Sequence, residues 1–300
     1  MNNRGYQQPQ AYRGPQINSP SSGSPSVDSP LDTVKQLSSK IEDTLDVVFD
    51  PIKPYLPALG RFLIVVTFLE DAIRIVTQWN DQLYYLQSYR GIWWGVSHLF
   101  LLFNVVAMFA GSFLVVSRKF TEVAIGTLLA VVVSQAFGYG LLFDLNFFFR
   151  NLSVVGGLMM VMSDSLSQKK QLFAGLPSIS ETDRRKYFQL AGRILLIFLF
   201  IGFVFHGQWS LTRVMFSLVG LVACIMVVVG FKARLSAIFL VLMLSMMNLL
   251  INNFWSVHST SPQRDFLKYD FFQTLSIMGG LLLLVNSGAG EIALDKKKVY

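Results

Sequence analysis

Eight long apolar segments follow one another along most of this chain, and each is close to the length that crosses a membrane as a helix. They cover roughly residues 57–79, 92–116, 121–143, 145–163, 190–206, 211–230, 235–254 and 266–286. A helix rises about 1.5 Å per residue, so roughly 20 apolar residues cross about 30 Å of hydrocarbon. The pattern predicts an all-α polytopic membrane protein with eight transmembrane helices. The third and fourth segments are almost continuous, which leaves seven spans as the alternative.

The first fifty residues follow a different pattern. Residues 1–30 are rich in Gln, Asn, Pro, Ser and Gly. Such a composition buries too little apolar surface to offset the entropy of ordering, so we predict a disordered tail. Residues 31–50 carry apolar side chains at steps of three and four, after Ser29 and Pro30 in positions typical of a helix start. This pattern predicts an amphipathic helix that lies on the membrane or packs against other helices.

Two stretches of the sequence occur twice. Residues 152–158 read LSVVGGL and residues 275–281 read LSIMGGL. The Gly60-Arg61 pair before the first apolar segment returns as Gly192-Arg193 before the fifth. Matches in the same order indicate an internal duplication. We therefore predict two parallel repeats of four helices each.

The composition indicates a membrane protein, and the positions of its basic residues predict its orientation in the membrane. The chain is 53% hydrophobic and 14% charged, with a mean hydropathy of +0.49, whereas soluble proteins are about 25% charged. The net charge of +7 comes from Lys and Arg in short loops rather than in one patch, which excludes a nucleic-acid interface. With eight spans most of these basic residues fall on one side and only Arg90 and Arg264 lie in loops on the other, so both termini are predicted to be cytosolic. In order, the predicted regions are a disordered tail (1–30), an amphipathic helix (31–50), a first repeat (51–163), a cytosolic connecting loop (164–189), a second repeat (190–286) and a cytosolic tail (287–300).

Charged side chains inside the apolar segments are the candidate functional residues, because an unpaired charge in hydrocarbon costs several kcal/mol. Glu70 and Arg74 lie four residues apart and are predicted to pair, which leaves Asp71. The network either fixes helix packing through ion pairs or lines a polar cavity that receives a ligand. The candidates share a position within or beside the spans on the side opposite the cytosol: Glu70, Asp71, Arg74, Trp79, Asp144, Arg150, Asp265, Lys268, Tyr269 and Asp270.

Motifs for catalysis are absent from the sequence. It has no phosphate-binding glycine loop, no metal-ligand spacing and no serine elbow. Its single cysteine, Cys224, excludes an intrachain disulfide and a cysteine metal cluster. We predict a protein that is not an enzyme and that uses no cofactor.

The chain ends in Lys297-Lys298-Val299-Tyr300. Two lysines at the third and fourth positions from the C-terminal carboxylate, on a cytosolic tail, fit the dilysine signal by which COPI coats retrieve membrane proteins to the endoplasmic reticulum. The alternative is that these lysines anchor the last helix at the membrane surface or contact anionic lipid.

Several stretches together resemble one known family. They are 68–71 with Arg74, Gln78 and Trp79, then 150–157, 173–177, 266–273 and the terminal lysines. From about residue 55 to 300 the chain resembles the surfeit-locus-four family of endoplasmic reticulum cargo receptors. Its Ser/Gly/Pro-rich tail is similar to the fungal branch, which includes the receptor for glycosylated pro-alpha-factor.

The resemblance implies a receptor that captures soluble secretory proteins in the lumen, enters COPII vesicles and returns from the Golgi through COPI. It also implies a relation to four-helix DoxX-like membrane proteins, which agrees with the duplication, and it makes the charged candidates a possible cargo pocket. A small-molecule or lipid transporter is the main alternative, because parallel repeats with charges at mid-membrane also describe transporters. A DoxX-like redox partner is a more distant one.

Overall fold

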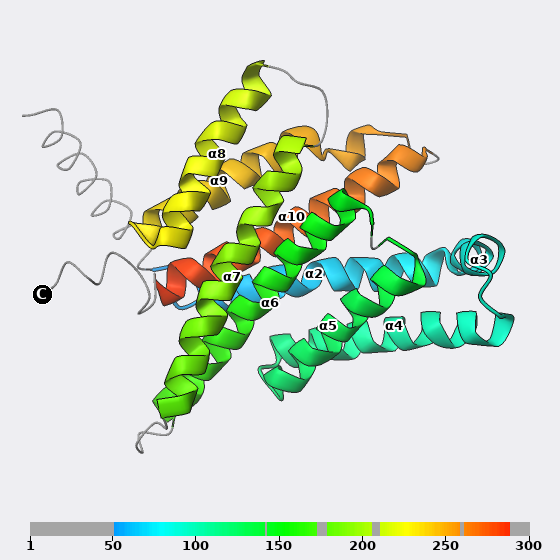
Figure 1. Ribbon diagram of the computed structural model, residues 1–300, viewed down its shortest axis with the longest axis horizontal. Helices are drawn as coiled ribbons and strands as arrows, with labels where there is room; N and C mark the ends of the chain where they lie inside the picture. The colour runs from blue at the N-terminus through cyan, green and yellow to red at the C-terminus, as the bar shows by residue number, and fades with distance from the viewer. Residues whose placement is uncertain (1–50, 142, 173–178, 206–210, 259–260, 289–300) are drawn as a thin grey trace, which may run out of the picture. The chain divides into compact units, whose positions relative to one another are not determined.

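The computed structural model of this chain is all-helical in the residues that it describes (Figure 1). These residues are 51–141, 143–172, 179–205, 211–258 and 261–288. The predicted disordered tail, the amphipathic helix at 31–50 and the terminal lysines lie outside them.

Long helices occupy all eight of the predicted apolar segments. They are α2 (Leu56–Thr77), α4 (Trp94–Val116), α5 (Thr121–Gly138), α6 (Leu145–Leu172), α7 (Ile179–Phe205), α8 (Leu211–Val229), α9 (Ala233–Ile251) and α10 (Pro262–Ser287). Three short elements lie between them, namely α3 (Trp79–Tyr84), the π-helix η1 (Tyr85–Tyr89) and the 3-10 helix η2 (Phe254–Ser256). Within the described ranges, four helical stretches are long and apolar enough to cross a membrane: Trp94–Val116, Thr121–Gly138, Ala233–Ser256 and Gln263–Ser287.

The third and fourth apolar segments are separate helices. α5 ends at Gly138, and Gly140 turns the backbone with a φ of +71°, a conformation that glycine adopts without strain. α6 then begins at Leu145, where the Asp144 carboxylate accepts a hydrogen bond from the Phe147 backbone N–H at 3.2 Å. The structure thus agrees with eight helical segments rather than seven.

The predicted connecting loop at 164–189 is largely helical. α6 continues to Leu172 and α7 already begins at Ile179. The apolar pattern stops earlier than the helix because hydropathy reports apolar surroundings, whereas Lys, Gln, Glu and Arg sustain a helix in polar ones. The prediction of a long loop was therefore wrong for most of its length.

Helix neighbours follow the same order in both halves of the chain. α2 contacts α4, α4 contacts α5 and α5 contacts α6, and in the second half α7, α8, α9 and α10 contact one another in the same succession. The halves meet through α2 with α10, α6 with α7, and α6 with α10. Exchanging the first four long helices for the last four leaves this pattern of neighbours unchanged.

The repeated glycines are where helices of the two halves cross. A Cβ atom added to Gly279 of α10 would lie 2.5 Å from the Gly60 carbonyl oxygen of α2. One added to Gly156 of α6 would lie 3.0 Å from the Gly192 carbonyl oxygen of α7. A side chain does not fit at 2.5 Å and is very crowded at 3.0 Å, so the duplicated glycines permit equivalent close crossings.

A serine three residues before each of these glycines joins the same helix pairs. The Ser276 hydroxyl donates to the Ile64 carbonyl oxygen at 2.9 Å, and the Ser153 hydroxyl donates to the Leu195 carbonyl oxygen at 3.5 Å. Both serines are fully buried. The repeated sequence therefore supplies a crossing and a hydrogen bond in each half.

Candidate functional site

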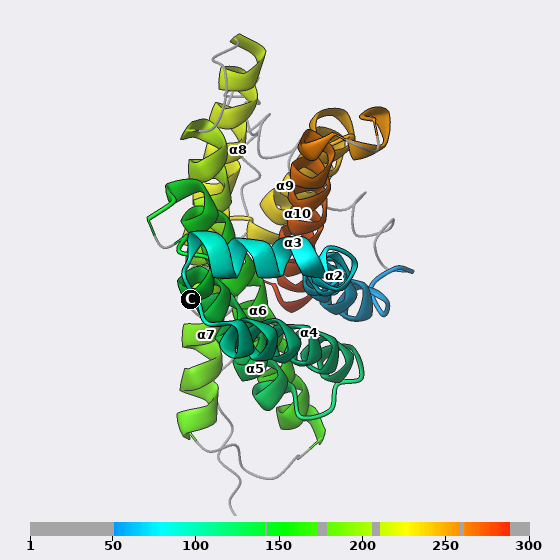
Figure 2. The ribbon, with the colours of Figure 1, turned by 90° about the vertical axis from the view of Figure 1, so that its right-hand side faces the viewer.

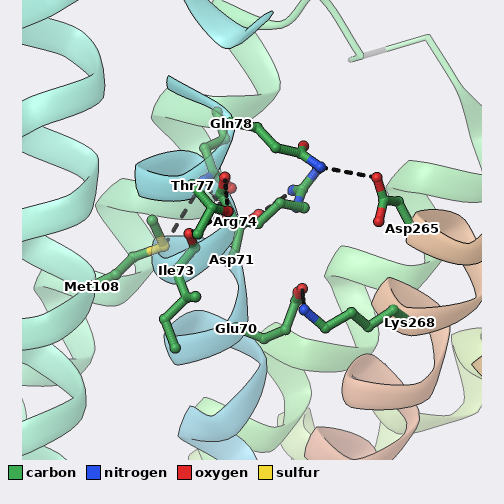
Figure 3. A network of polar contacts seen from close by, with 10 residues as sticks. Glu70, Asp71, Ile73, Arg74, Thr77, Gln78, Met108, Asp265 and Lys268 are labelled. Carbon is green, nitrogen blue, oxygen red and sulfur yellow. Dashed lines mark hydrogen bonds and ion pairs between the residues drawn. The ribbon is translucent and has the colours of Figure 1, made fainter. Parts of the chain in front are cut away.

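One face of α2 carries polar side chains toward α10. Glu70, Arg74 and Gln78 are four residues apart and so lie along one side of the helix. Asp265 and Lys268, from the first turns of α10, face them (Figure 3). We call these five residues the α2–α10 seam, and we call the end of the helices at which α3 lies the α3 end.

The deepest contact of the seam is an ion pair between Glu70 and Lys268. The Lys268 Nζ atom lies 3.3 Å from the Glu70 Oε1 atom, and the Glu70 residue is only 5% exposed. Apart from this ion pair, neither carboxylate oxygen has a hydrogen-bond partner among the described residues. Glu70 thus keeps hydrogen-bond capacity that a bound ligand can use.

The Asp71 carboxylate is fully engaged beside this pair. Arg74 donates to one of its oxygens, and the Gln135 amide of α5 donates to the other at 2.6 Å. The Arg74 guanidinium also lies 5.5 Å from the centre of the Tyr269 ring. This arrangement joins α2 to both α5 and α10.

The predicted pairing of Glu70 with Arg74 was wrong. Arg74 pairs with Asp71, three residues earlier, and Glu70 pairs across the helices with Lys268. Side chains three and four residues apart share one helix face, so the spacing alone does not choose between the two acids. The contact between α2 and α10 decides the pairing, because it places Lys268 beside Glu70 and leaves Arg74 to pair with Asp71.

The outer edge of the seam is a hydrogen bond at the α3 end. The Gln78 amide donates to the Asp265 carboxylate at 2.9 Å, and both residues reach solvent. Asp265 lies in the first turn of α10, where the helix dipole favours an acid. The seam therefore runs from an exposed polar contact to a buried one along two continuous helices.

The remaining predicted residues lie in different surroundings. Trp79 begins α3 and places its ring 6.2 Å from that of His98. Asp144 is exposed at the start of α6, and Asp270 is partly buried on α10. Nothing is described of the Arg150 side chain.

The structure adds polar residues that the sequence analysis did not select. Gln135 is partly buried in an apolar helix, and an amide in such a helix is itself a signal of an interhelical hydrogen bond. Gln78 belongs to the stretches that resemble the family, but it was not predicted as a site residue. Across the described ranges, no three His, Cys, Asp or Glu side chains group in a way that suits a metal ion.

Comparison with known proteins identifies the family. The model of the SURF4 family matches residues 35–300. This chain belongs to the SURF4 family. The resemblance that the sequence motifs indicate is thus confirmed, and the whole α2–α10 seam lies within the matched residues.

Three relatives of known name cover most of the chain. The Surfeit locus protein 4 homolog of Schizosaccharomyces pombe is 50% identical, over 89% of this chain and 90% of the relative. The ER-derived vesicles protein ERV29 of Saccharomyces cerevisiae is 43% identical, over 89% and 85%. The Surfeit locus protein 4 homolog of Drosophila melanogaster is 38% identical, over 87% and 96%. No solved structure matches the chain.

Proposed function

We propose that this protein is a cargo receptor of the endoplasmic reticulum membrane that captures soluble secretory proteins in the lumen and accompanies them into transport vesicles. The observation that carries this proposal is membership of the SURF4 family, together with a 43% identical relative named for ER-derived vesicles. The proposed function involves no catalysis and no cofactor. Lipids of the membrane surround the long helices, whose outward side chains include Leu99, Phe113 and Leu242.

In this proposal eight helices cross the membrane as two parallel four-helix, DoxX-like repeats with both termini in the cytosol. The matching order of helix neighbours and the matching glycine crossings support the duplication. Basic residues support the orientation, since Arg118, Lys119, Lys232 and Arg234 lie in or beside the turns at the end opposite α3. The α3 end and the open side of the seam then face the lumen.

A short cargo segment would enter the seam from the lumen. Its polar groups would bind Glu70, which keeps free hydrogen-bond capacity, and its apolar groups would pack beside Tyr269. Weak binding is sufficient, because confinement of receptor and cargo in one vesicle raises their effective concentration.

The cytosolic side would carry the sorting signals. We propose that COPII coats load the receptor and that COPI coats retrieve it through Lys297 and Lys298. Replacing both lysines by serine should leave the fold intact and move the protein from the reticulum to the Golgi or beyond, as fluorescence microscopy measures. Unchanged reticular residence would contradict retrieval by this signal.

Site-specific photocrosslinking in microsomes tests the cargo site. Photoreactive residues at positions 70, 79, 265 and 269 should crosslink to a soluble secretory precursor. The control position is 242, whose side chain is 61% exposed on the lipid-facing side of α9. Failure of all four positions, with normal insertion into the membrane, would remove the seam as the cargo site.

Transport of a small molecule or lipid is the competing function, because Glu70 and Asp71 are buried within α2. A transporter of this type commonly binds its substrate at a helix that is broken at membrane depth. In the described part of the chain, α2 and α10 are both continuous through the seam. This observation favours a receptor.

A further inference from the structure

The connection between α2 and α4 is longer than its equivalent in the second half. It spans residues 78–93 and holds α3 and η1, whereas the connection between α7 and α8 spans only residues 206–210. We call residues 79–90 the strap. α3 lies across the ends of the long helices rather than along them, and it is seen end-on in Figure 1 and lengthwise in Figure 2. If the long helices cross a membrane, α3 runs close to the plane of the membrane surface.

The inner side of the strap is fastened to α4 and α5. Leu86 is fully buried, and its carbonyl oxygen accepts a hydrogen bond from the Ile92 backbone N–H at 3.0 Å, which holds η1 beside the start of α4. The Arg90 guanidinium donates to the Gly138 carbonyl oxygen of α5 at 3.1 Å. Carbonyl groups at a helix C-terminus carry partial negative charge, so a cation binds them favourably. The strap is thus held against the first half of the chain.

The outer side of the strap and the start of α4 are aromatic. Tyr84, Tyr89, Trp93 and Trp94 are each at least 64% exposed. The Tyr89 ring stacks on that of Tyr85 with ring centres 5.6 Å apart, and it meets the Tyr84 ring edge-on at 6.2 Å. Exposed apolar side chains that gather in this way mark a contact surface.

The composition of the strap is typical of a membrane surface. Asp81 is the one charged residue among residues 79–89, whereas about a quarter of the residues in soluble proteins are charged. Trp and Tyr gather at membrane–water interfaces, because the ring can lie in apolar surroundings while its N–H or O–H group reaches water. A surface in contact with the aqueous lumen alone would carry more charge.

The start of α4 indicates the depth of these rings. Trp94–Val116 is long and apolar enough to cross a membrane. Its 23 residues rise about 35 Å, slightly more than the roughly 30 Å of hydrocarbon, so Trp94 lies at the membrane surface. The hydrogen bond between Ile92 and Leu86 holds η1 beside this point. The exposed tyrosines therefore lie at the level of the lipid headgroups rather than out in the lumen, where a protein partner would meet them.

We propose that the strap is an interfacial anchor, whose partner is the phospholipid surface and whose exposed Tyr84 and Tyr89 rings lie in the headgroup layer together with Trp93 and Trp94. The choice of the luminal leaflet rests on the orientation in the proposed function, whereas the contact with lipid does not. The strap begins directly after Gln78, so the anchor also fixes the end of α2 at the membrane surface.

Fluorescence quenching in nanodiscs tests the anchor without any cargo. In a C224A background, S88C places one thiol on the exposed part of η1, where it is labelled with the fluorophore NBD. The full-length protein, checked for a single symmetric size-exclusion peak, is placed in phosphatidylcholine nanodiscs, which leave both membrane surfaces accessible. A lipid with a nitroxide near its headgroup should quench this label more strongly than a lipid with a nitroxide near its chain end.

Two exposed positions calibrate the quenching. A label at L99C, on the lipid-facing side of α4, should be quenched more strongly by the nitroxide near the chain end. A label at R184C, which precedes the apolar segment of α7, should be quenched by iodide in the water. Iodide quenching at position 88 should be about tenfold weaker than at position 184, because a charged ion is excluded from the boundary between headgroups and acyl chains.

A matched pair of double variants shows whether the rings hold the strap in the interface. Y84S/Y89S removes both rings and should lower headgroup-lipid quenching at position 88 about threefold, whereas Y84W/Y89W keeps interfacial rings and should leave it unchanged. Equal quenching in the two double variants would overturn the anchor. A label at position 88 that iodide quenches as strongly as the label at position 184 would also overturn it and would leave the strap to a protein partner in the lumen.

The anchor and the proposed function can fail separately, because the nanodiscs hold no cargo. Lipid quenching at position 88 together with failed crosslinking from positions 70, 79, 265 and 269 would support the anchor and remove the seam as the cargo site. Crosslinking from those positions without lipid quenching at position 88 would overturn the anchor alone.

Discussion

The helix pairs α2–α10 and α6–α7 are equivalent by the internal duplication, and among the side chains that the structure describes the two pairs differ near the α3 end. Both pairs cross through repeated glycines. Near the α3 end, α2–α10 holds the Glu70–Lys268 ion pair, whereas α6–α7 holds Phe149 and Phe198 stacked with ring centres 5.8 Å apart. The glycines permit close crossings in both pairs, and the residues beyond them form an ion pair in one and an aromatic stack in the other.

The opposite end shows a second difference between the halves. Arg61 of α2 and Asp164 of α6 form a buried ion pair, with the two side chains 2% and 7% exposed. At the equivalent place in the second half, Arg193 donates to the Gln189 carbonyl oxygen at 3.3 Å, and the Gln189 amide donates to the Gly288 carbonyl oxygen at 2.7 Å. The first half thus shows a buried ion pair at this place, whereas the second half shows hydrogen bonds from Arg193 and Gln189 to backbone carbonyl groups.

The largest expected effect is the loss of that ion pair. D164A leaves the Arg61 charge buried and should lower the free energy of unfolding by about 3–5 kcal/mol. Replacing Gln189 by Ala in the other half should lower it by about 1 kcal/mol, the value of a neutral hydrogen bond. Denaturant unfolding in detergent measures both, and a double variant, Arg61→Met with Asp164→Leu, should recover most of the loss. Equal effects of the two single variants would remove this difference between the halves.

Substitutions at the glycine crossings should have an intermediate effect on the free energy of unfolding. G279A and G156A each force a side chain against a backbone carbonyl and should cost about 1–3 kcal/mol. G126A is the control, because nothing lies within 4 Å of its added Cβ atom. If only one of G279A and G156A lowers the free energy of unfolding, the two crossings are not packed alike.

The smallest effect in free energy falls on the seam, and it concerns binding rather than folding. E70Q keeps the shape of the side chain and removes its charge, so cargo crosslinking in microsomes should fall about tenfold, or about 1.4 kcal/mol. F149L in the equivalent helix pair should change crosslinking less than about twofold. Similar losses of crosslinking in E70Q and F149L would contradict a specific role of the Glu70–Lys268 pair in cargo binding.

Much of the fold follows from the sequence, because the lengths of the apolar segments and the repeated glycine motifs can both be recognised in short stretches of sequence. The eight helical segments and the recurrence of Gly60 as Gly192 were predicted in this way, whereas the close crossings at these glycines come from the structure. The full lengths of α6 and α7 were not, since a helix can leave the apolar layer without ending. Asp164 was consequently assigned to a loop, although it binds Arg61 inside the structure.

The site was predicted as a set of residues but not as a set of contacts. Charges in apolar segments select Glu70, Asp71 and Lys268 as candidates, and the structure then brings Lys268 beside Glu70. Their pairing depends on which helices meet, and that information lies in tertiary contacts between distant parts of the chain. Gln135 was not selected because only charged and aromatic side chains within or beside the apolar segments were taken as candidates.

The most direct test of the central claim compares photocrosslinking from position 269 on α10 with that from position 149 on α6, in microsomes that import a soluble secretory precursor. The seam predicts a strong crosslink to the precursor from position 269, reduced by E70Q, and little or none from position 149. Equal crosslinking from the two positions, or crosslinking from position 269 that E70Q leaves unchanged, would contradict the claim that the α2–α10 seam, and not the equivalent α6–α7 pair, binds cargo.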